Sequence, residues 1–161
     1  MRIGVVSDTH DRADNVARIV ELFNAARVER VVHTGDITRP NTLELFGRLA
    51  MPLVGVYGNN DHELDALAHA ARAVGAEFRS GVLARQWHGR RIGVIHDPAE
   101  LEPERLAGWD LLLHGHTHRH VQERVGDTLV FNPGECAGMM AGHNRIGIVD
   151  LAQLDFELLY F

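Results

Sequence analysis

Short hydrophobic runs alternate with amphipathic stretches in the first half of the chain. Residues 2–6, 30–34 and 53–57 are mostly apolar and rich in branched side chains, and each run predicts a buried strand. Between the first two runs, hydrophobic residues recur at the spacing of one helix face, namely Val16, Ile19, Val20 and Phe23. We therefore predict a helix there, with Asp14 or Asn15 capping its start.

Two further helices are predicted in this half. Asn41 followed by Glu44 has the spacing of a capping box, in its Asn variant, and this pattern predicts a helix through Leu49 that ends before Pro52. The next helical pattern runs over 63–73, and Gly75 is expected to end that helix. This alternation of strands and helices is typical of an α/β architecture.

The second half of the chain contains mainly strand patterns. They cover residues 82–87, 91–96, 111–114, 121–125, 128–131, 145–151 and 154–160. Gly89 interrupts the first pair like a hairpin turn, and Gly126 and Asp127 form a turn dipeptide later in the chain. We predict an α/β fold with two mixed β-sheets packed as a sandwich flanked by helices. The length fits one domain over residues 1–161.

Composition narrows the functional classes. The net charge is -6, which argues against binding to polymeric nucleic acid along a broad basic surface. All 16 basic residues are arginine, so the sequence has no lysine for a P-loop or a Schiff base. Cys136 is the single cysteine, and no stretch approaches the roughly 18 apolar residues of a membrane span. We expect a cytoplasmic protein that does not enter the membrane.

Polar residues of the kinds that bind metals follow five predicted strands directly. The five clusters are Asp8-Thr9-His10, Gly35-Asp36, Gly58-Asn59-Asn60-Asp61, His96-Asp97 and Gly115-His116-Thr117-His118. Loops at the carboxyl ends of strands gather at one edge of an α/β sheet, so the clusters can converge on one site. Each cluster alone is a weak signal, because such short patterns occur often by chance, but the combination of five is specific.

The residue types in these clusters narrow the metal and the reaction. Imidazoles mixed with carboxylates and an amide oxygen, without thiolate, suit Mn²⁺, Fe, Zn²⁺, Co²⁺ or Ni²⁺ better than Ca²⁺. The ligands exceed what one tetrahedral zinc needs, and they suffice for two ions if one carboxylate bridges them. Two cations about 3.5–4 Å apart can share a water, lower its pKa and neutralise charge on a phosphate. Phosphoryl transfer is therefore the expected chemistry.

The order of these clusters resembles the calcineurin-like metallophosphoesterase superfamily, whose small bacterial and archaeal phosphodiesterase branch is closest to this chain in length. The segment Asn132-Pro133-Gly134 also matches that branch. The resemblance implies two divalent metal ions, for which we expect Mn²⁺, with Ni²⁺, Fe, Zn²⁺, Co²⁺ and Mg²⁺ as alternatives. It implies that Asp36 bridges the ions, that the first is also held by Asp8, His10 and His118, and the second by Asn59, His96 and His116.

One position departs from the family pattern. Many members carry a histidine directly after the asparagine of the Gly-Asn pair, where it contacts substrate and helps the leaving group depart, and here that residue is Asn60. Asn60 cannot act as a general acid, so the substrate range and the rate are open while the metal ligands are complete. Whether His62 reaches the site is not readable from the sequence. For substrate contacts we name Asn59 and Arg119, and Arg39 is a weaker candidate.

Other residues have simpler interpretations. His33 and His114 precede ligand clusters on strands, and we expect them to support ligands or pack in the core. Cys136 is expected to be a small buried residue rather than a nucleophile. The remaining histidines outside the clusters and His62 have no expected role, and they are His69, His88, His120 and His143.

Three functions follow from this pattern. The first is a phosphodiesterase that acts on small phosphate esters, in which the attacking water lies between the two metals. The second is a scaffold or binding protein with the same fold and little catalysis, which loss of ligand histidines would favour, and none is lost here. The third is a phosphomonoesterase, because nothing in the sequence shapes the leaving-group pocket. The sequence leaves a homo-oligomer open.

Overall fold

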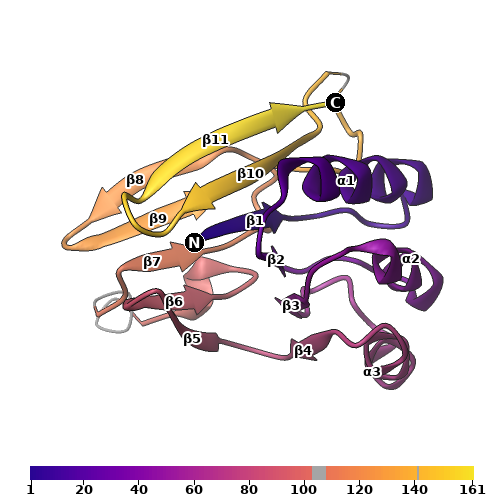
Figure 1. Cartoon of the computed structure of the whole chain (residues 1–161). Coiled ribbons are helices and arrows are strands. Elements are labelled where there is room, and N and C mark those ends of the chain that lie inside the picture. The colour runs from indigo at the N-terminus through magenta and orange to yellow at the C-terminus, as the bar shows by residue number, and fades with distance from the viewer. Residues whose placement is uncertain (103–107, 141) are drawn as a thin grey trace.

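The computed structural model describes residues 1–102, 108–140 and 142–161. Two β-sheets pack against each other in this part of the chain (Figure 1). The larger has six strands in the order β11-β10-β1-β2-β3-β4. Their bounds are β1 Arg2–Val6, β2 Arg30–His33, β3 Leu53–Val56, β4 Glu77–Arg79, β10 Arg145–Asp150 and β11 Asp155–Tyr160.

The second sheet has five strands in the order β5-β6-β7-β9-β8. Their bounds are β5 Leu83–Trp87, β6 Arg90–Val94, β7 Leu111–Leu113, β8 Val121–Val125 and β9 Thr128–Asn132. Both sheets are mixed: β1 to β4 are parallel while β10 and β11 are antiparallel, and β6, β7 and β9 are parallel while β5 and β8 pair antiparallel at the edges.

Three α-helices of the described residues cover one face of the six-stranded sheet, on the side away from the second sheet (Figure 1). They are α1 Ala13–Ala26, α2 Pro40–Leu45 and α3 Leu64–Ala73, and short 3₁₀ turns follow at Phe46–Arg48 and Pro98–Glu100. The predicted α/β sandwich of two mixed sheets is therefore confirmed. Among the described residues, the α-helices flank only one of the two sheets.

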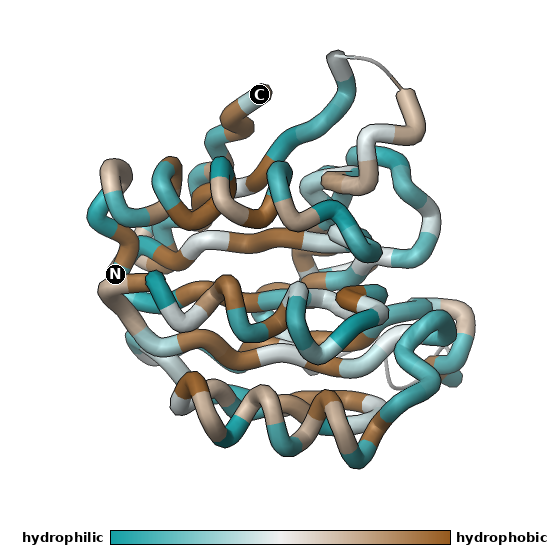
Figure 2. The backbone as a smooth tube through the Cα atoms, turned by 90° about the vertical axis from the view of Figure 1, so that its right-hand side faces the viewer, coloured by the Kyte–Doolittle hydropathy of each residue, from teal (hydrophilic) through white to brown (hydrophobic). Residues whose placement is uncertain are grey.

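Two apolar layers hold this arrangement together. One lies between the six-stranded sheet and the helices and includes Phe23, Leu43 and Leu67. The other lies between the sheets and includes Val5 and Phe131. The helices alternate hydrophobic and hydrophilic residues while the strands are hydrophobic over much of their length (Figure 2). Burial of apolar area in both layers, worth about 25 cal/mol per Å², fixes the strand ends relative to one another.

Several local predictions were wrong. The strand β4 was not predicted, because it is three residues long and has no hydrophobic run. Helix α1 begins after Arg12 without a side-chain cap, and the Asn15 amide instead donates to the Cys136 carbonyl (2.6 Å). Helix α2 starts at Pro40, whose fixed φ suits the first helical position, so Asn41 is not the N-cap; it lies inside the first turn, where its Oδ1 accepts from the Thr42 N–H (3.0 Å).

No helix among the described residues is both long and apolar enough to cross a membrane.

Candidate metal centre

The loops that follow β1, β2, β3, β6 and β7 meet at the carboxyl ends of these strands. They carry all seven side chains that were predicted as metal ligands, Asp8, His10, Asp36, Asn59, His96, His116 and His118. Parallel pairing of β1, β2 and β3 in one sheet, and of β6 and β7 in the other, brings the ends together. The structure thus gathers residues from positions 8 to 118 at one edge of the sandwich.

Three side chains form the first part of the cluster. Ligand atoms of Asp8, His10 and His118 all lie within 4.8 Å of one another. His10 Nε2 and His118 Nε2 are 3.4 Å apart, and His118 Nε2 lies 3.5 Å from Asp8 Oδ1. Imidazole nitrogens that face each other and a carboxylate at these distances are arranged as ligands of a common cation.

A second part adjoins the first. Ligand atoms of Asp8, Asp36 and His96 also lie within 4.8 Å of one another. The Asn59 side-chain oxygen lies 2.9 Å from His96 Nε2 and 2.9 Å from His116 Nδ1, so these three side chains face one point.

Asp36 faces both parts of the cluster. Its Oδ2 lies 3.8 Å from His10 Nε2, and its Oδ1 lies 3.5 Å from His96 Nε2. The two groups of mutually close ligand atoms share Asp8, whereas the resemblance makes Asp36 the shared ligand. The two oxygens of Asp36 nevertheless point to opposite parts, as a bridging carboxylate requires.

The burial and bonding of these groups fit a divalent cation. Asp8 and Asp36 are 0% and 1% exposed. Asp8 Oδ1 has no hydrogen-bond partner among the described residues, and burial raises the pKa of the Asp8 carboxyl while hydrogen bonding from Ser7 lowers it. A buried carboxylate oxygen without a donor is costly, and a cation beside it would remove that cost. The donor set of oxygens and imidazole nitrogens without sulfur suits the divalent metals named above.

Backbone strain is concentrated in the same loops. Nine non-glycine residues have positive φ in the described chain, and five of them are predicted ligands, namely Asp8, His10, Asp36, His116 and His118. Left-handed backbone is unfavourable for most side chains and persists only where the surroundings enforce it. Such strain indicates a functional site, and it could not be read from the sequence.

Two glycines allow backbone to approach the carboxylates. A Cβ at Gly58 would collide with Asp36 Oδ1, and a Cβ at Gly115 would collide with Ser7 Oγ and lie 2.9 Å from Asp8 Oδ2. The glycines that precede Asn59 and His116 in sequence therefore serve close packing around the carboxylates.

Asp61 holds two of the ligand loops together, a role that sequence reasoning missed. Its Oδ2 accepts from the backbone N–H groups of Asp36 (3.0 Å) and Gly58 (2.7 Å), and its Oδ1 accepts from that of Thr38 (2.6 Å). Asp61 is 4% exposed, and burial raises its pKa while these hydrogen bonds lower it. The only sequence signal was its position in the Gly58 to Asp61 cluster.

Two further carboxylates stand behind ligand histidines. Asp97 Oδ2 lies 3.6 Å from His116 Nε2, and Glu135 Oε2 lies 3.5 Å from His118 Nδ1. Partners of this kind orient an imidazole and raise its basicity toward a metal. Asp97 had no assigned role because it is adjacent to His96 in sequence, but it turns toward a different histidine.

The remaining histidines are mostly in the positions expected. His33 is buried, its Nδ1 accepts from the Gly35 N–H (3.1 Å), and its Nε2 is 3.0 Å from Thr9 Oγ1. Burial lowers the pKa of His33 to about 3, so it packs as a neutral ring behind the ligand loops. His114 is also buried, and burial lowers its pKa. His143 is exposed, but it lines a cavity at the site.

The residues considered for substrate contact do not all lie at the cluster. Asn60 donates its side-chain amide to Asp36 Oδ2 (2.7 Å) and its backbone N–H to Asp36 Oδ1 (2.9 Å). His62 and Arg39 line a small cavity of about 240 Å³ together with His10 and Asn60, so both face the cluster. Arg119 is exposed, and it does not line the three cavities described beside His10, Asn60 and His96.

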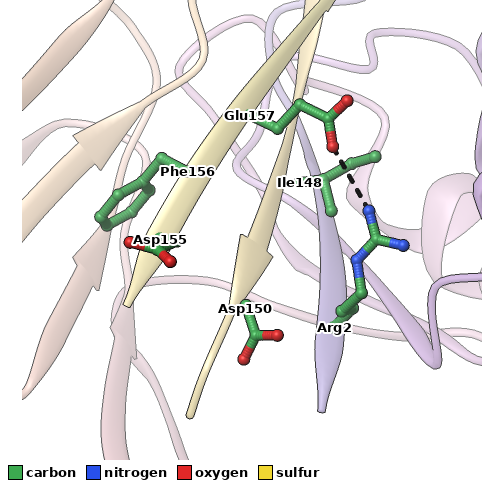
Figure 3. A pocket seen from close by; sticks show the side chains of 6 residues that line it. All are labelled: Arg2, Ile148, Asp150, Asp155, Phe156 and Glu157. Atoms are coloured by element: carbon green, nitrogen blue, oxygen red, sulfur yellow. Dashed lines mark hydrogen bonds and ion pairs between the residues drawn. The ribbon is translucent and has the colours of Figure 1, made fainter. Parts of the chain in front are cut away.

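The sandwich has another recess away from these loops, with a volume of about 210 Å³ (Figure 3). It is lined by residues of β1, β10 and β11, namely Arg2, Ile148, Asp150, Asp155, Phe156 and Glu157. Arg2 is paired there with Glu157 at 3.3 Å. None of the predicted site residues lies in it.

Cys136 is buried, as predicted. Its thiol donates to the Arg145 carbonyl oxygen (3.1 Å), and burial raises its pKa above the ordinary range of thiols. A protonated, inaccessible thiol is not a nucleophile.

Comparison with known proteins agrees with this geometry. The family model of the calcineurin-like phosphoesterase superfamily domain matches residues 1–154. A phosphodiesterase of Methanocaldococcus jannaschii is 34% identical over 98% of this chain and 97% of its own length. A phosphodiesterase of Escherichia coli K12 is 28% identical over 83% of this chain and 78% of its own.

Solved structures show the same fold. An archaeal phosphodiesterase superposes with a TM-score of 0.91 and 32% identity over 100% of both chains. A Vps29 variant from Entamoeba histolytica superposes with a TM-score of 0.71 over 100% of this chain and 99% of its own, but its 19% identity indicates shared fold alone. The full-length sequence matches and the gathered metal-type ligands lead to one assignment: the chain belongs to the calcineurin-like phosphoesterase superfamily.

Proposed function

We propose that this protein is a metal-dependent hydrolase that cleaves small phosphodiesters. The observation that carries the proposal is the convergence of seven metal-type ligands from five strand ends, with an unpartnered buried carboxylate oxygen on Asp8. The names of the two phosphodiesterase relatives support the diester as substrate.

The ligands divide between two divalent cations in this proposal. Asp8, His10, Asp36 and His118 would hold one cation, and Asp36, Asn59, His96 and His116 the other. Bound cations would lower the pKa of a water molecule and offset the charge of a phosphate group. Mn²⁺ is our first choice, and Ni²⁺, Fe, Zn²⁺, Co²⁺ and Mg²⁺ suit the same donors. We also propose that the protein works in the cytoplasm, since its one cysteine cannot form an internal disulfide.

The protein's own residues orient this centre. Asp61 fixes the loops of Asp36 and Gly58 through three backbone hydrogen bonds. Asp97 Oδ2 and Glu135 Oε2 lie 3.6 and 3.5 Å from the rings of His116 and His118, where a negative charge favours these rings as metal ligands. Asn59 is exposed on the outer side of the cluster, so its amide can also contact a phosphate oxygen.

The test is an assay of purified protein that has been stripped with chelator and reloaded with each candidate metal. We expect hydrolysis of an aryl phosphodiester that depends on added metal, with slower hydrolysis of the corresponding monoester. Protein that binds two equivalents of metal but cleaves neither ester would indicate the scaffold function instead. Saturation at a single equivalent would contradict the two-cation site.

A further inference from the structure

A cavity of about 500 Å³ opens beside the candidate metal centre. Its inner wall includes His10 and His118, with Asn60 beside them, and its outer wall includes Met139, Met140 and His143. We call this cavity the methionine recess. Its volume lies in the range of cavities that take small organic groups, which is about 300–1,000 Å³.

The backbone of Met139 and Met140 is hydrogen-bonded to Glu135. Glu135 is 2% exposed, and its carboxylate accepts from the backbone N–H groups of Met139 (3.3 Å) and Met140 (3.0 Å). Asn144 accepts from the Gly138 N–H (2.9 Å), so the segment is tied on that side as well. The carboxylate that lies behind His118 thus also positions the two methionines, and the recess and the metal ligand share one support.

The two methionines are unusually exposed. Met139 is 71% and Met140 59% exposed, the highest values among the large hydrophobic side chains of the described residues. Apolar side chains held in water beside a site indicate a surface that a ligand covers. Methionine sulfur is polarizable and packs well against aromatic rings, and its flexible side chain adapts to rings of different shape.

The recess offers no arginine to pair with a second anionic group. No arginine is among the described residues that line it, and its one acidic side chain, Glu135, is 2% exposed. The exposed ring of His143 and the amide of Asn60 are the polar groups available to an uncharged ligand.

We propose that the methionine recess binds a flat, uncharged aromatic group of the substrate, an aryl ring or a nucleobase, while the phosphate lies at the metal centre. This inference rests on the proposed phosphodiesterase function and adds the class of ester to it. Met139 and Met140 are the specificity-determining residues.

The first test compares inhibitors that carry one organic group each. Methylphosphonate, phenylphosphonate and thymidine 5′-methylphosphonate would be measured as inhibitors of the metal-loaded enzyme with methyl p-nitrophenyl phosphate as substrate. We expect phenylphosphonate to bind about 10-fold more tightly than methylphosphonate, from contacts of the ring with methionine. The thymidine compound distinguishes a nucleobase site from a smaller aryl site.

The variant Met139→Ser/Met140→Ser should bring this ratio close to one and leave inhibition by methylphosphonate within about twofold, because only the ring contacts are lost. Val125→Ser is the matched control. Val125 is exposed and pairs with Thr128 at the turn of the β8–β9 hairpin. The site lies toward the other end of β9, at Asn132, so Val125 is remote from the recess. The proposal would be overturned if wild-type enzyme bound phenylphosphonate no more tightly than methylphosphonate. It would also be overturned if the double variant lost the same affinity for both phosphonates.

The second test does not depend on activity or metal. Protein labelled with ¹³C at the methionine methyl groups has four signals, from Met1, Met51, Met139 and Met140. Addition of phenol or thymidine to metal-free protein should shift the signals of Met139 and Met140 and leave those of Met1 and Met51 unchanged. The proposal would be overturned if all four signals shifted equally or if none shifted. It would also be overturned if the Met139 and Met140 signals moved with protein concentration alone, as when a second copy of the protein covers the recess.

These tests separate the two proposals. If the metal-loaded enzyme cleaves no phosphate ester while aromatic compounds shift the two methionine signals, the proposed function fails and the recess stands. If the enzyme cleaves diesters without preference for aromatic inhibitors and the signals do not move, the recess fails and the function stands.

Discussion

At the amino end of β1, Arg2 lies in a recess of about 210 Å³ and pairs with Glu157, while Asp150 accepts from the Ala152 N–H (2.8 Å). At the carboxyl end of the same strand, Asp8 carries a buried oxygen without a donor, and the neighbouring methionine recess measures about 500 Å³. Strand β1 therefore has a paired charge at its amino end and a carboxylate with an unpartnered buried oxygen beyond its carboxyl end.

The carboxyl end of β1 therefore carries the features of a functional site, whereas its amino end carries ordinary surface charges. Paired, exposed charges such as Arg2 and Glu157 contribute roughly 0–1 kcal/mol to folding. Buried carboxylates without full partners oppose folding, and the positive φ angles of the ligand loops add strain. We therefore expect substitutions at the carboxyl end to change function strongly, and those at the amino end to change it little.

The largest effect is expected from Asp36→Asn, because Asp36 faces both parts of the ligand cluster. Elemental analysis should show lowered occupancy at both metal positions, and activity should fall by ~10³-fold or more, as the loss of several kcal/mol of charge stabilisation implies. His10→Ala should lower occupancy chiefly at one position. Equal, small losses from the two variants would show that Asp36 does not bridge.

The next largest effect is a gain, expected from Asn60→His. Asn60 lies against Asp36 and lines the recess, so a histidine there is close to the reacting phosphate. General acid catalysis by this ring should raise rates by about 10²-fold for diesters with poor leaving groups and far less for good ones. Steady-state rates for diesters of graded leaving-group pKa, with metal content checked, would measure it. Parallel dependences for both proteins would mean that another group, such as His62, already supplies the proton.

The sequence predicted the architecture well, because short hydrophobic runs mark strands and strand ends converge in an α/β sheet. It missed β4, since Glu77–Arg79 pairs at a sheet edge without an apolar run. It also mistook the starts of two helices, because Asn15 and Asn41 have cap-type side chains that here hydrogen-bond elsewhere.

The site was predicted at the level of residue types but not of side-chain directions. Adjacent residues such as His96 and Asp97 serve different neighbours, and this depends on how the loop turns after the strand. Glu135 and the methionine recess belong to the irregular segment after β9. Its path depends on two hydrogen bonds, from the Gly138 N–H to Asn144 and from the Arg145 N–H to the Glu135 carbonyl oxygen. Hydrogen bonds of this kind leave no periodic pattern in the sequence.

A smaller effect is expected in the pH dependence of stability. His33 has a pKa of about 3 in the folded protein against an ordinary value of 6.5, because burial disfavours its charged form. Below about pH 6.5 the unfolded chain therefore binds a proton at His33 that the folded chain does not, and stability falls as the pH falls toward 3, by up to about 1.4 kcal/mol per pH unit.

His33→Asn keeps an acceptor for the Gly35 N–H but cannot titrate. Urea unfolding of metal-free protein between pH 7 and pH 4 should give a shallower slope for this variant than for wild type. The comparison uses slopes because the lost ring contact with Phe46 lowers the stability of the variant at every pH. Identical slopes would show that His33 is protonated in the folded protein.

The smallest effects come from a matched pair of carboxylate substitutions that compares the two ends of the sheet directly. Glu135→Gln removes the charge behind His118, and its single amide oxygen can accept from the backbone N–H of Met139 or of Met140 but not from both, because these groups donate to different carboxylate oxygens. Metal affinity should fall by about 10-fold, the lower limit for loss of a partner of a ligand histidine. Glu157→Gln removes the same charge beside Arg2, and because that pair is exposed and remote from the ligands, metal affinity should change by less than about twofold.

Calorimetric titration with Mn²⁺ measures the metal affinity of both variants, and thermal unfolding of the metal-free proteins separates a change of affinity from a change of folding. Loss of one backbone hydrogen bond to Glu135 should lower metal-free stability by about 1–3 kcal/mol, so a variant that binds metal weakly because it is unfolded would be recognised at once. Equal losses of affinity in the two variants would mean that the net charge of the protein, and not the carboxylate behind His118, governs metal binding.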